Sequence, residues 1–297
     1  MPIYFDHNAT TAVDESVFTA MQPYFREVFG NPSSLHRFGR NARDAVNRAR
    51  EQLAALVGVQ ASQLLFTSGG TEANNTAIKG LVKPGDRVLI SALEHPSLYE
   101  LLTPLKRQGV EAQYIPALAN GQLDLDALDD LLAQGPVRLV SVMRVNNETG
   151  VLQPTAAIAQ RVHAAGALYH CDAVQAAGKL PLSWAATGAD LMSLSSHKIY
   201  GPKGVGALVL DKRVDMQALL HGGGHEQGLR AGTENLAAIV GFGAAAELAA
   251  KEPNAAAIAG ALAAEHYGLN ILESDIQDNA ANATRFLVLG KQCSPAT

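Results

Sequence analysis

SLSSHKIYGPKGVGA, residues 193–207, places a lysine directly after a short apolar run. Residues 191–194 are typical of the end of a buried strand, and the sequence YGPKG at residues 200–204 is strong turn punctuation. Lys198 is therefore predicted to lie on a tight connection just past the carboxyl end of a strand. In an open α/β sheet, ligands bind at that edge.

Short apolar runs and helical patterns alternate on both sides of this stretch. The β-like runs are residues 63–67, 87–91, 138–142, 168–171, 191–194 and 205–210, and helical segments are expected at 72–81, 97–108, 125–133 and 155–165. A helical pattern also covers residues 12–57, with a turn cluster at 30–34. This alternation predicts an α/β fold with a mostly parallel, doubly wound sheet flanked by helices.

The composition and charge of the chain argue against some classes of partner. The chain has 297 residues, 47% of them hydrophobic, and a formal net charge of -5 with no long block of like charges. This balance argues against a nucleic-acid partner and a membrane-surface helix, so we expect a small-molecule substrate. With no apolar run of about 20 residues and no signal-peptide pattern at the start, we expect a cytoplasmic protein.

A candidate phosphate cradle lies at residues 67–74, TSGGTEAN, where a glycine turn leads into a helix. The free N–H groups and the dipole of a helix start suit a phosphate, although an ordinary helix start explains the same residues.

Three further candidates follow predicted strands. Asp172 could keep a ring nitrogen protonated, and His95 could stack on a ring or move protons, although a structural cap and an incidental loop histidine are the commoner roles. Lys198 could form a Schiff base if its pKa is lowered, and the neighbouring Ser195 and Ser196 are small enough to admit a ring. Together with the cradle, these residues point to pyridoxal 5'-phosphate.

The chain resembles the cysteine desulfurases, class V enzymes of the fold-type I pyridoxal-phosphate group. The matching motifs are YFDHNATT (4–11), GNPSS (30–34), FTSGGTE (66–72), VNNETG (145–150), HCDAVQ (170–175), SHKIYGPKG (196–204), HGGGHE (221–226) and RAGTEN (230–235). The resemblance spans about residues 1–250 and implies the large domain of that fold, with a seven-stranded type of sheet. It also implies conversion of L-cysteine to L-alanine, sulfur delivery to an acceptor protein and a part in iron–sulfur cluster assembly.

The resemblance assigns roles residue by residue. Lys198 would bond to the cofactor, and Asp172 would contact the pyridine nitrogen. The remaining roles are ring stacking and acid/base work for His95, contacts near the ring hydroxyl and the substrate carboxylate for Gln175 and Asn147, phosphate binding for Gly70, Thr71, Ser195 and His197, and contact with the partner subunit's phosphate for Thr233. The last role implies a homodimer.

The resemblance to cysteine desulfurases stops near residue 250. Residues 252–291 instead resemble a fragment of prephenate dehydratase around its Thr-Arg-Phe motif, here Thr284 to Phe286. The expected division is an N-terminal segment (1–15), a cofactor-binding large domain (16–250) and an atypical tail (251–297), with the small domain incomplete and the catalytic cysteine loop missing.

We therefore expect an impaired desulfurase. The alternatives are a non-catalytic cofactor-binding or dimerising remnant, residual cysteine lyase or aminotransferase-type activity, and an aromatic-acid-binding fragment of dehydratase type.

Other polar residues are weaker candidates. His221 and His225 could suggest a metal site by spacing, but no carboxylate or cysteine cluster accompanies them, so no metal is expected. The two cysteines, Cys171 and Cys293, are far apart and form no CxxC motif. Cys171 falls in a predicted buried strand and Cys293 is near the end of the sequence, so neither is expected to act as the nucleophile.

Overall fold

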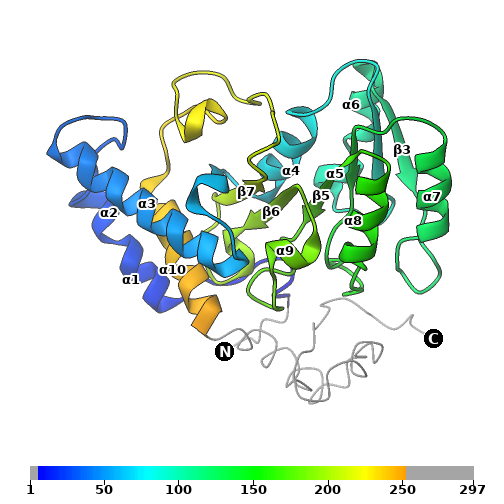
Figure 1. The fold of residues 1–297 in the computed structure, drawn as a ribbon. Coiled ribbons are helices and arrows are strands. Elements are labelled where there is room, and N and C mark those ends of the chain that lie inside the picture. Colours follow the sequence, from blue (N-terminus) through cyan, green and yellow to red (C-terminus); the bar gives the residue numbers. More distant parts are fainter. Residues whose placement is uncertain (1–5, 252–297) are drawn as a thin grey trace, which may run out of the picture.

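A seven-stranded sheet organises residues 6–251, the part of the chain that this computed structural model describes (Figure 1). The strands are β1 (Leu64–Thr67), β2 (Arg87–Ser91), β3 (Glu111–Ile115), β4 (Leu139–Ser141), β5 (Leu168–Asp172), β6 (Leu191–Ser195) and β7 (Gly206–Leu210). They lie in the order β1-β7-β6-β5-β4-β2-β3. All neighbours are parallel except β7, which is antiparallel to both β1 and β6. The expected mostly parallel sheet is confirmed.

Both faces of the sheet are covered, which is why its strands read as unbroken apolar runs. In β1, Leu64 and Phe66 join one hydrophobic cluster while Leu65 joins the other, because successive side chains point to opposite faces. In β7, Val209 and Leu208 divide in the same way. The core is therefore two layers, one on each side of the sheet.

The helices form the two outer layers (Figure 1). They are α1 (Glu15–Met21), α2 (Pro23–Arg26), α3 (Arg37–Val57), α4 (Gly70–Lys79), α5 (Pro96–Tyr99), α6 (Leu102–Arg107), α7 (Leu125–Ala133), α8 (Thr155–Ala164), α9 (Trp184–Thr187) and α10 (Leu236–Lys251). α3 packs along α10, and their buried residues share a cluster with α8, whereas α4, α5 and α6 contribute to the opposite cluster.

α3 is the longest helix among the described residues, and its ends follow ordinary capping rules. The ring nitrogen Nδ1 of His36 accepts the Gly39 N–H at 3.3 Å, and Gly58 ends the helix at φ 73°, a left-handed conformation that glycine adopts without strain. Its apolar stripe, which includes Val46 and Leu53, packs into the core.

Sequence and structure agree on all six expected strands. β3, α9 and α10 are additional, the helical stretch expected at 12–57 contains α1, α2 and α3, and the single helix expected at 97–108 is divided into α5 and α6. Pro104 explains the division, because proline has no N–H to donate and is tolerated only in the first turn of a helix, so a new helix begins at Leu102.

The N-terminal residues 1–5 and the whole stretch that resembles prephenate dehydratase lie outside the described residues. Within residues 6–251, no helix combines the length and the apolar character needed to span a bilayer.

Candidate active site

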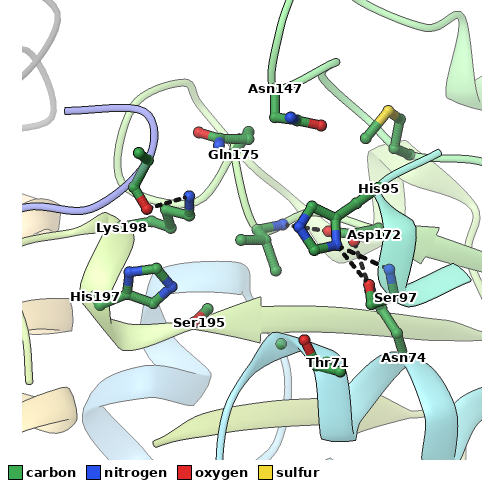
Figure 2. Close-up of a pocket in the computed structure, with 14 residues that line it drawn as sticks. Thr71, Asn74, His95, Ser97, Asn147, Asp172, Gln175, Ser195, His197 and Lys198 are labelled. Atoms are coloured by element: carbon green, nitrogen blue, oxygen red, sulfur yellow. Dashed lines mark hydrogen bonds between the residues drawn. The ribbon is translucent and has the colours of Figure 1, made fainter. Parts of the chain in front are cut away.

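A cavity of about 220 Å³ opens at the edge of the sheet where its parallel strands end (Figure 2). It is lined by Ala9, Gly70, Thr71, Asn74, His95, Ser97, Met143, Asn147, Asp172, Val174, Gln175, Ser195, His197 and Lys198. Every site residue expected from the sequence is in this set except Thr233. β2, β4, β5 and β6 run parallel, so the residues that follow them meet at one edge.

Lys198 follows β6 on a 3-10 turn, η2 (Ser196–Lys198). Its Nζ donates to the backbone carbonyl of Ala9 at 2.8 Å and to that of Asn8. Two residues later, Tyr200 has φ 63°, an uncommon conformation for a residue with a side chain, and a Cβ on Gly201 would lie 2.0 Å from the Ser196 Oγ. This tight backbone is the turn that the sequence predicts, and it brings the amine back over the strand end.

Burial lowers the pKa of the Lys198 ammonium, although the negative charge of Asp172 acts in the opposite direction. The pKa of His197 is lowered to about 4, first by burial and then by the positive charges of Lys198, Lys203 and Lys179. His197 is therefore neutral at pH 7, and its Nδ1 lies 3.1 Å from the Thr10 hydroxyl. The site thus combines an amine of lowered pKa with a neutral imidazole.

Asp172 is the last residue of β5 and is only 5% exposed. Its Oδ2 accepts the Asn74 Nδ2–H at 2.7 Å, and its Oδ1 accepts the Val174 N–H at 2.9 Å. Burial raises the pKa of this carboxyl, while these two hydrogen bonds and the nearby positive charge of Lys198 lower it. A buried carboxylate held in this way can contact a protonated ring nitrogen.

His95 follows β2 and caps α5, which fixes its tautomer. The Ser97 N–H points to His95 Nδ1 at 3.1 Å, so Nδ1 acts as an acceptor and a neutral ring carries its proton on Nε2. The Ser97 hydroxyl lies 2.8 Å from the same nitrogen and accepts from Asn74 Nδ2 at 2.8 Å. A chain of hydrogen bonds therefore connects His95 to Asp172 through Ser97 and Asn74 (Figure 2).

One end of the cavity has the features of an anion site. α4 begins at Gly70 and Thr71, so the unpaired N–H groups of its first turn face this region. A Cβ at position 70 would lie 3.0 Å from Val174 Cγ2, so a side chain there would fill this end of the cavity and glycine keeps it open. The Ser195 hydroxyl is buried here without a hydrogen-bond partner among the described residues. A buried hydroxyl without a partner is expected where a ligand oxygen binds.

Gly206 supports this anion site from β7. It pairs with both Thr67 of β1 and Ser195 of β6. A Cβ at this position would lie 2.5 Å from the carbonyl carbon of Gly69, so a larger residue would push away the loop that leads into α4. The antiparallel β7 thus holds the loop in place.

Gln175 and Asn147 line the side of the cavity opposite the start of α4 (Figure 2). The Gln175 Nε2 donates to the backbone carbonyl of Asn8 at 2.9 Å, and its Oε1 accepts from Lys179 at 2.6 Å. The Asn147 Nδ2 donates to Glu148 at 2.7 Å. Both amides are therefore oriented by hydrogen bonds before any ligand binds.

Thr233 is exposed and does not line this cavity. Its loop is anchored to the start of α4, because the guanidinium of Arg230 contacts the Glu72 carboxylate at 2.8 and 3.3 Å. The same loop is held to α3 by the pair of Arg50 with Glu226.

Cys171, the cysteine in the described part of the chain, is fully buried in β5, and burial raises the pKa of its thiol to about 12. It cannot supply a thiolate near pH 7. This agrees with the expectation that Cys171 is a core residue.

Asn74, Ser97 and Met143 also line the cavity and were given no role in the sequence analysis. Asn74 had a usable signal, since it follows Gly70 by four residues and lies on the same helix face. Ser97 and Met143 had none, because only the tertiary structure shows which loop residues face the cavity.

Comparison with known proteins agrees with this geometry. The family model described as "Aminotransferase class-V" matches residues 3–282. A cysteine desulfurase of Sinorhizobium fredii is 49% identical over 253 residues, which cover 84% of this chain and 65% of that relative. Among solved structures, a NifS-like protein superposes with a TM-score of 0.85 at 37% identity and covers 90% of this chain and 74% of its own.

A further solved structure, described as SspA in complex with cysteine, superposes with a TM-score of 0.79 at 35% identity and covers 83% of this chain and 72% of its own. The match to the curated relative from Sinorhizobium covers 65% of that protein, so the chain spans slightly less than two-thirds of its length. The family match extends to residue 282 and includes most of the stretch ascribed to prephenate dehydratase, so that second resemblance is not supported.

Proposed function

Because the chain belongs to the class V aminotransferase family, we propose that it is a pyridoxal-phosphate-dependent enzyme of the cysteine desulfurase type that acts on L-cysteine. The observation that carries the proposal is the convergence of Lys198 and Asp172 on one cavity, with the first turn of α4 at its end. An amine, an acid for a ring nitrogen and an anion site are the three groups that this cofactor requires.

The residues of the cavity fit the cofactor. The unpartnered hydroxyl of Ser195 and the open space kept by Gly70 provide room and hydrogen bonds for a phosphate. We propose that these two residues, Thr71 and His197 bind the phosphate, that Asp172 contacts the ring nitrogen and that Lys198 bonds covalently to the cofactor. When bound, the cofactor supplies an electron sink for the electron pair left at the substrate Cα.

The chain's own residues can move the Cα proton. Burial lowers the pKa of Lys198, so a larger share of this amine is neutral at pH 7 than of an exposed lysine, and a neutral amine can accept a proton. His95 presents Nε2 as a second proton-transfer group, because Nδ1 is held by Ser97. We propose that the Asn147 amide binds the substrate carboxylate.

Sulfur transfer needs a thiolate, and the described residues do not provide one, since Cys171 is buried with a raised pKa and Cys293 lies outside them. We therefore propose that sulfur transfer is impaired in this chain. The remaining route is elimination: removal of the Cα proton expels hydrosulfide, and hydrolysis of the product yields pyruvate and ammonia.

The test of cofactor binding is the intact mass of the protein after incubation with pyridoxal phosphate and borohydride reduction. We expect a pyridoxyl adduct on Lys198, and we expect the Lys198→Ala variant to lose the visible absorbance band while it keeps its thermal unfolding temperature. An adduct on Lys203 or Lys212 would contradict the assignment.

The products formed from L-cysteine test the proposal that sulfur transfer is impaired and that elimination remains. Sulfide with pyruvate, unchanged in Cys293→Ser, is the expected result. Stoichiometric alanine with a protein persulfide that disappears in Cys293→Ser would show full desulfurase activity instead. Cofactor binding without any product would favour the second candidate function, a non-catalytic cofactor-binding protein. The observation behind this candidate is the complete burial of Cys171.

We also propose that the chain forms a homodimer in which Thr233 contacts the phosphate of the partner subunit. Support comes from the exposure of Thr233 and from its anchoring through Arg230, which presents the loop outward from the start of α4. A sulfur-acceptor protein is proposed as a further partner.

A further inference from the structure

Lys179 is a buried lysine that lies behind the wall of the cavity rather than in it. It is 5% exposed and is not among the lining residues. Its Nζ donates to Gln175 Oε1 at 2.6 Å and to Asn8 Oδ1 at 3.2 Å. Buried lysines are rare because removal of an ammonium from water is costly, so one that contacts a cavity-lining amide calls for an explanation.

The contacts of Gln175 permit one orientation of its amide. Oε1 faces Lys179, which as an ammonium can only donate, and Nε2 faces the Asn8 carbonyl, which can only accept. A flipped amide would put two donors together on one side and two acceptors together on the other. Since Nε2 carries two hydrogens and Asn8 accepts one, the second N–H remains for a ligand in the cavity.

We propose that Lys179 is a positioning residue that locks the Gln175 amide with its N–H, and not its carbonyl oxygen, available to the cofactor. This inference rests on the proposed function, because it requires pyridoxal phosphate in the cavity. The phenolic oxygen of that cofactor is negatively charged in its coloured form, so an N–H donor stabilises it and a carbonyl oxygen would repel it.

A positioning role explains the contacts of Lys179 better than a direct effect of its charge on the cofactor. The pKa of Lys179 is lowered to about 7, first by burial and then by the positive charge of Lys198, so near pH 7 the side chain is often neutral. A neutral amine still donates hydrogen bonds to Gln175 Oε1 and Asn8 Oδ1, whereas its electrostatic effect on the cavity is largely lost. The neutral amine also has a lone pair that can accept, so in this form the Asn8 carbonyl, which can only accept, is the contact that keeps Nε2 on its side.

The experiment compares cofactor binding in four variants at one pH. They are Lys179→Met, Gln175→Ala, the double variant, and Lys106→Met as a control that removes an exposed lysine of α6. The readouts are the dissociation constant of pyridoxal phosphate and the position of the visible absorbance maximum of the bound cofactor. Neither requires turnover.

We expect Lys179→Met to weaken cofactor binding about tenfold or more, as for the loss of a hydrogen bond to a charged group, and to shift the absorbance maximum. Lys106→Met should match the wild type. In the Gln175→Ala background, Lys179→Met should cause little further change, because a positioning residue has no effect once the residue that it positions is gone.

Equal losses from Lys179→Met with and without Gln175 would overturn the inference, as would an unchanged Lys179→Met variant. If the methionine variant does not fold, Lys179→Gln takes its place in the same cycle. Failure of the wild type to bind the cofactor at Lys198 would refute the proposed function itself, and the two failures are thereby distinguished.

Discussion

Asp172 and Lys198 bring opposite charges into one cavity, and burial shifts the pKa of each toward its neutral form. For Asp172, the shift is opposed by the hydrogen bond from Asn74 and by that from the Val174 N–H. A carboxylate balanced in this way remains a strong partner for a positively charged ring nitrogen. At the scale of the single residue, the proposed role of Asp172 therefore depends on the hydrogen bonds that favour its ionised form.

We predict that Asp172→Asn lowers the rate of exchange of the substrate Cα proton with deuterium on the order of 100-fold, the usual effect of removing one preorganised charge from an active site. NMR of L-alanine in deuterated buffer measures this rate in the cofactor-bound protein. Asp129→Asn, which alters an exposed carboxylate of α7, is the control. Equal rates in Asp172→Asn and the wild type would remove Asp172 from the proposed mechanism.

At the scale of the secondary-structure element, a buried histidine joins three neighbouring strands at the centre of the sheet. His170 of β5 is completely buried, with Nδ1 2.8 Å from the Ser141 hydroxyl of β4 and Nε2 2.9 Å from the Ser193 hydroxyl of β6. Burial lowers its pKa to about 3. This neutral ring therefore links three parallel strands that end at the candidate active site.

We predict that protonation of His170 contributes to acid unfolding. Its pKa is about 3 in the folded state and 6.5 in the reference state, so the unfolded chain binds the extra proton between these values. The free energy of unfolding should therefore fall as the pH decreases below about 6.5, by up to a few kcal/mol, relative to a variant without the group. Urea denaturation of the wild type and His170→Gln between pH 7.5 and 4.5 measures the difference.

The expected result is a wild-type stability advantage that is constant above pH 6.5 and shrinks below it. A difference between wild type and His170→Gln that stays constant across the whole range would contradict the prediction.

At the scale of the whole molecule, the proposed homodimer depends on the loop around Thr233, a residue that is exposed and does not line the cavity of its own chain. The loop is held firmly, since Arg50 forms two hydrogen bonds with Glu226, at 2.8 and 2.6 Å, and the Phe66 N–H donates to the same carboxylate at 2.8 Å. Glu226 and Gln227 have φ 45° and 61°, conformations that persist only when their surroundings enforce them. A loop fixed in this way can serve a site on another subunit.

We predict that two variants, each defective in cofactor binding, form a hybrid dimer with one restored site. Thr233→Val should weaken cofactor retention, and Lys198→Ala should abolish covalent binding. In a hybrid dimer, the Thr233→Val subunit keeps Lys198 and receives Thr233 from its partner, so one of the two sites is complete. Coexpression followed by measurement of bound pyridoxal phosphate tests this, and cofactor retention no better than in the Thr233→Val homodimer would contradict a shared site.

The sequence alone determined the class of the fold and most of the candidate site. Apolar runs mark strands buried on both faces, and the Gly-rich and Lys-Ile-Tyr-Gly-Pro turns mark their ends, because these patterns depend on local periodicity and backbone geometry. β3 escaped notice because it is the edge strand with an exposed first residue, Glu111, and α10 because its alanine-rich sequence lacks a clear polar face.

Tertiary structure alone decided which side chains touch. The path from His95 through Ser97 and Asn74 to Asp172, and the lock of Lys179 on Gln175, join residues whose orientation no local pattern specifies. The same holds for protonation, since the shifted pKa values of Asp172, Lys179 and His197 arise chiefly from burial. Burial is a property of the packed molecule and depends on segments distant in the chain, so the motifs identified the chemistry while packing set its geometry and charge.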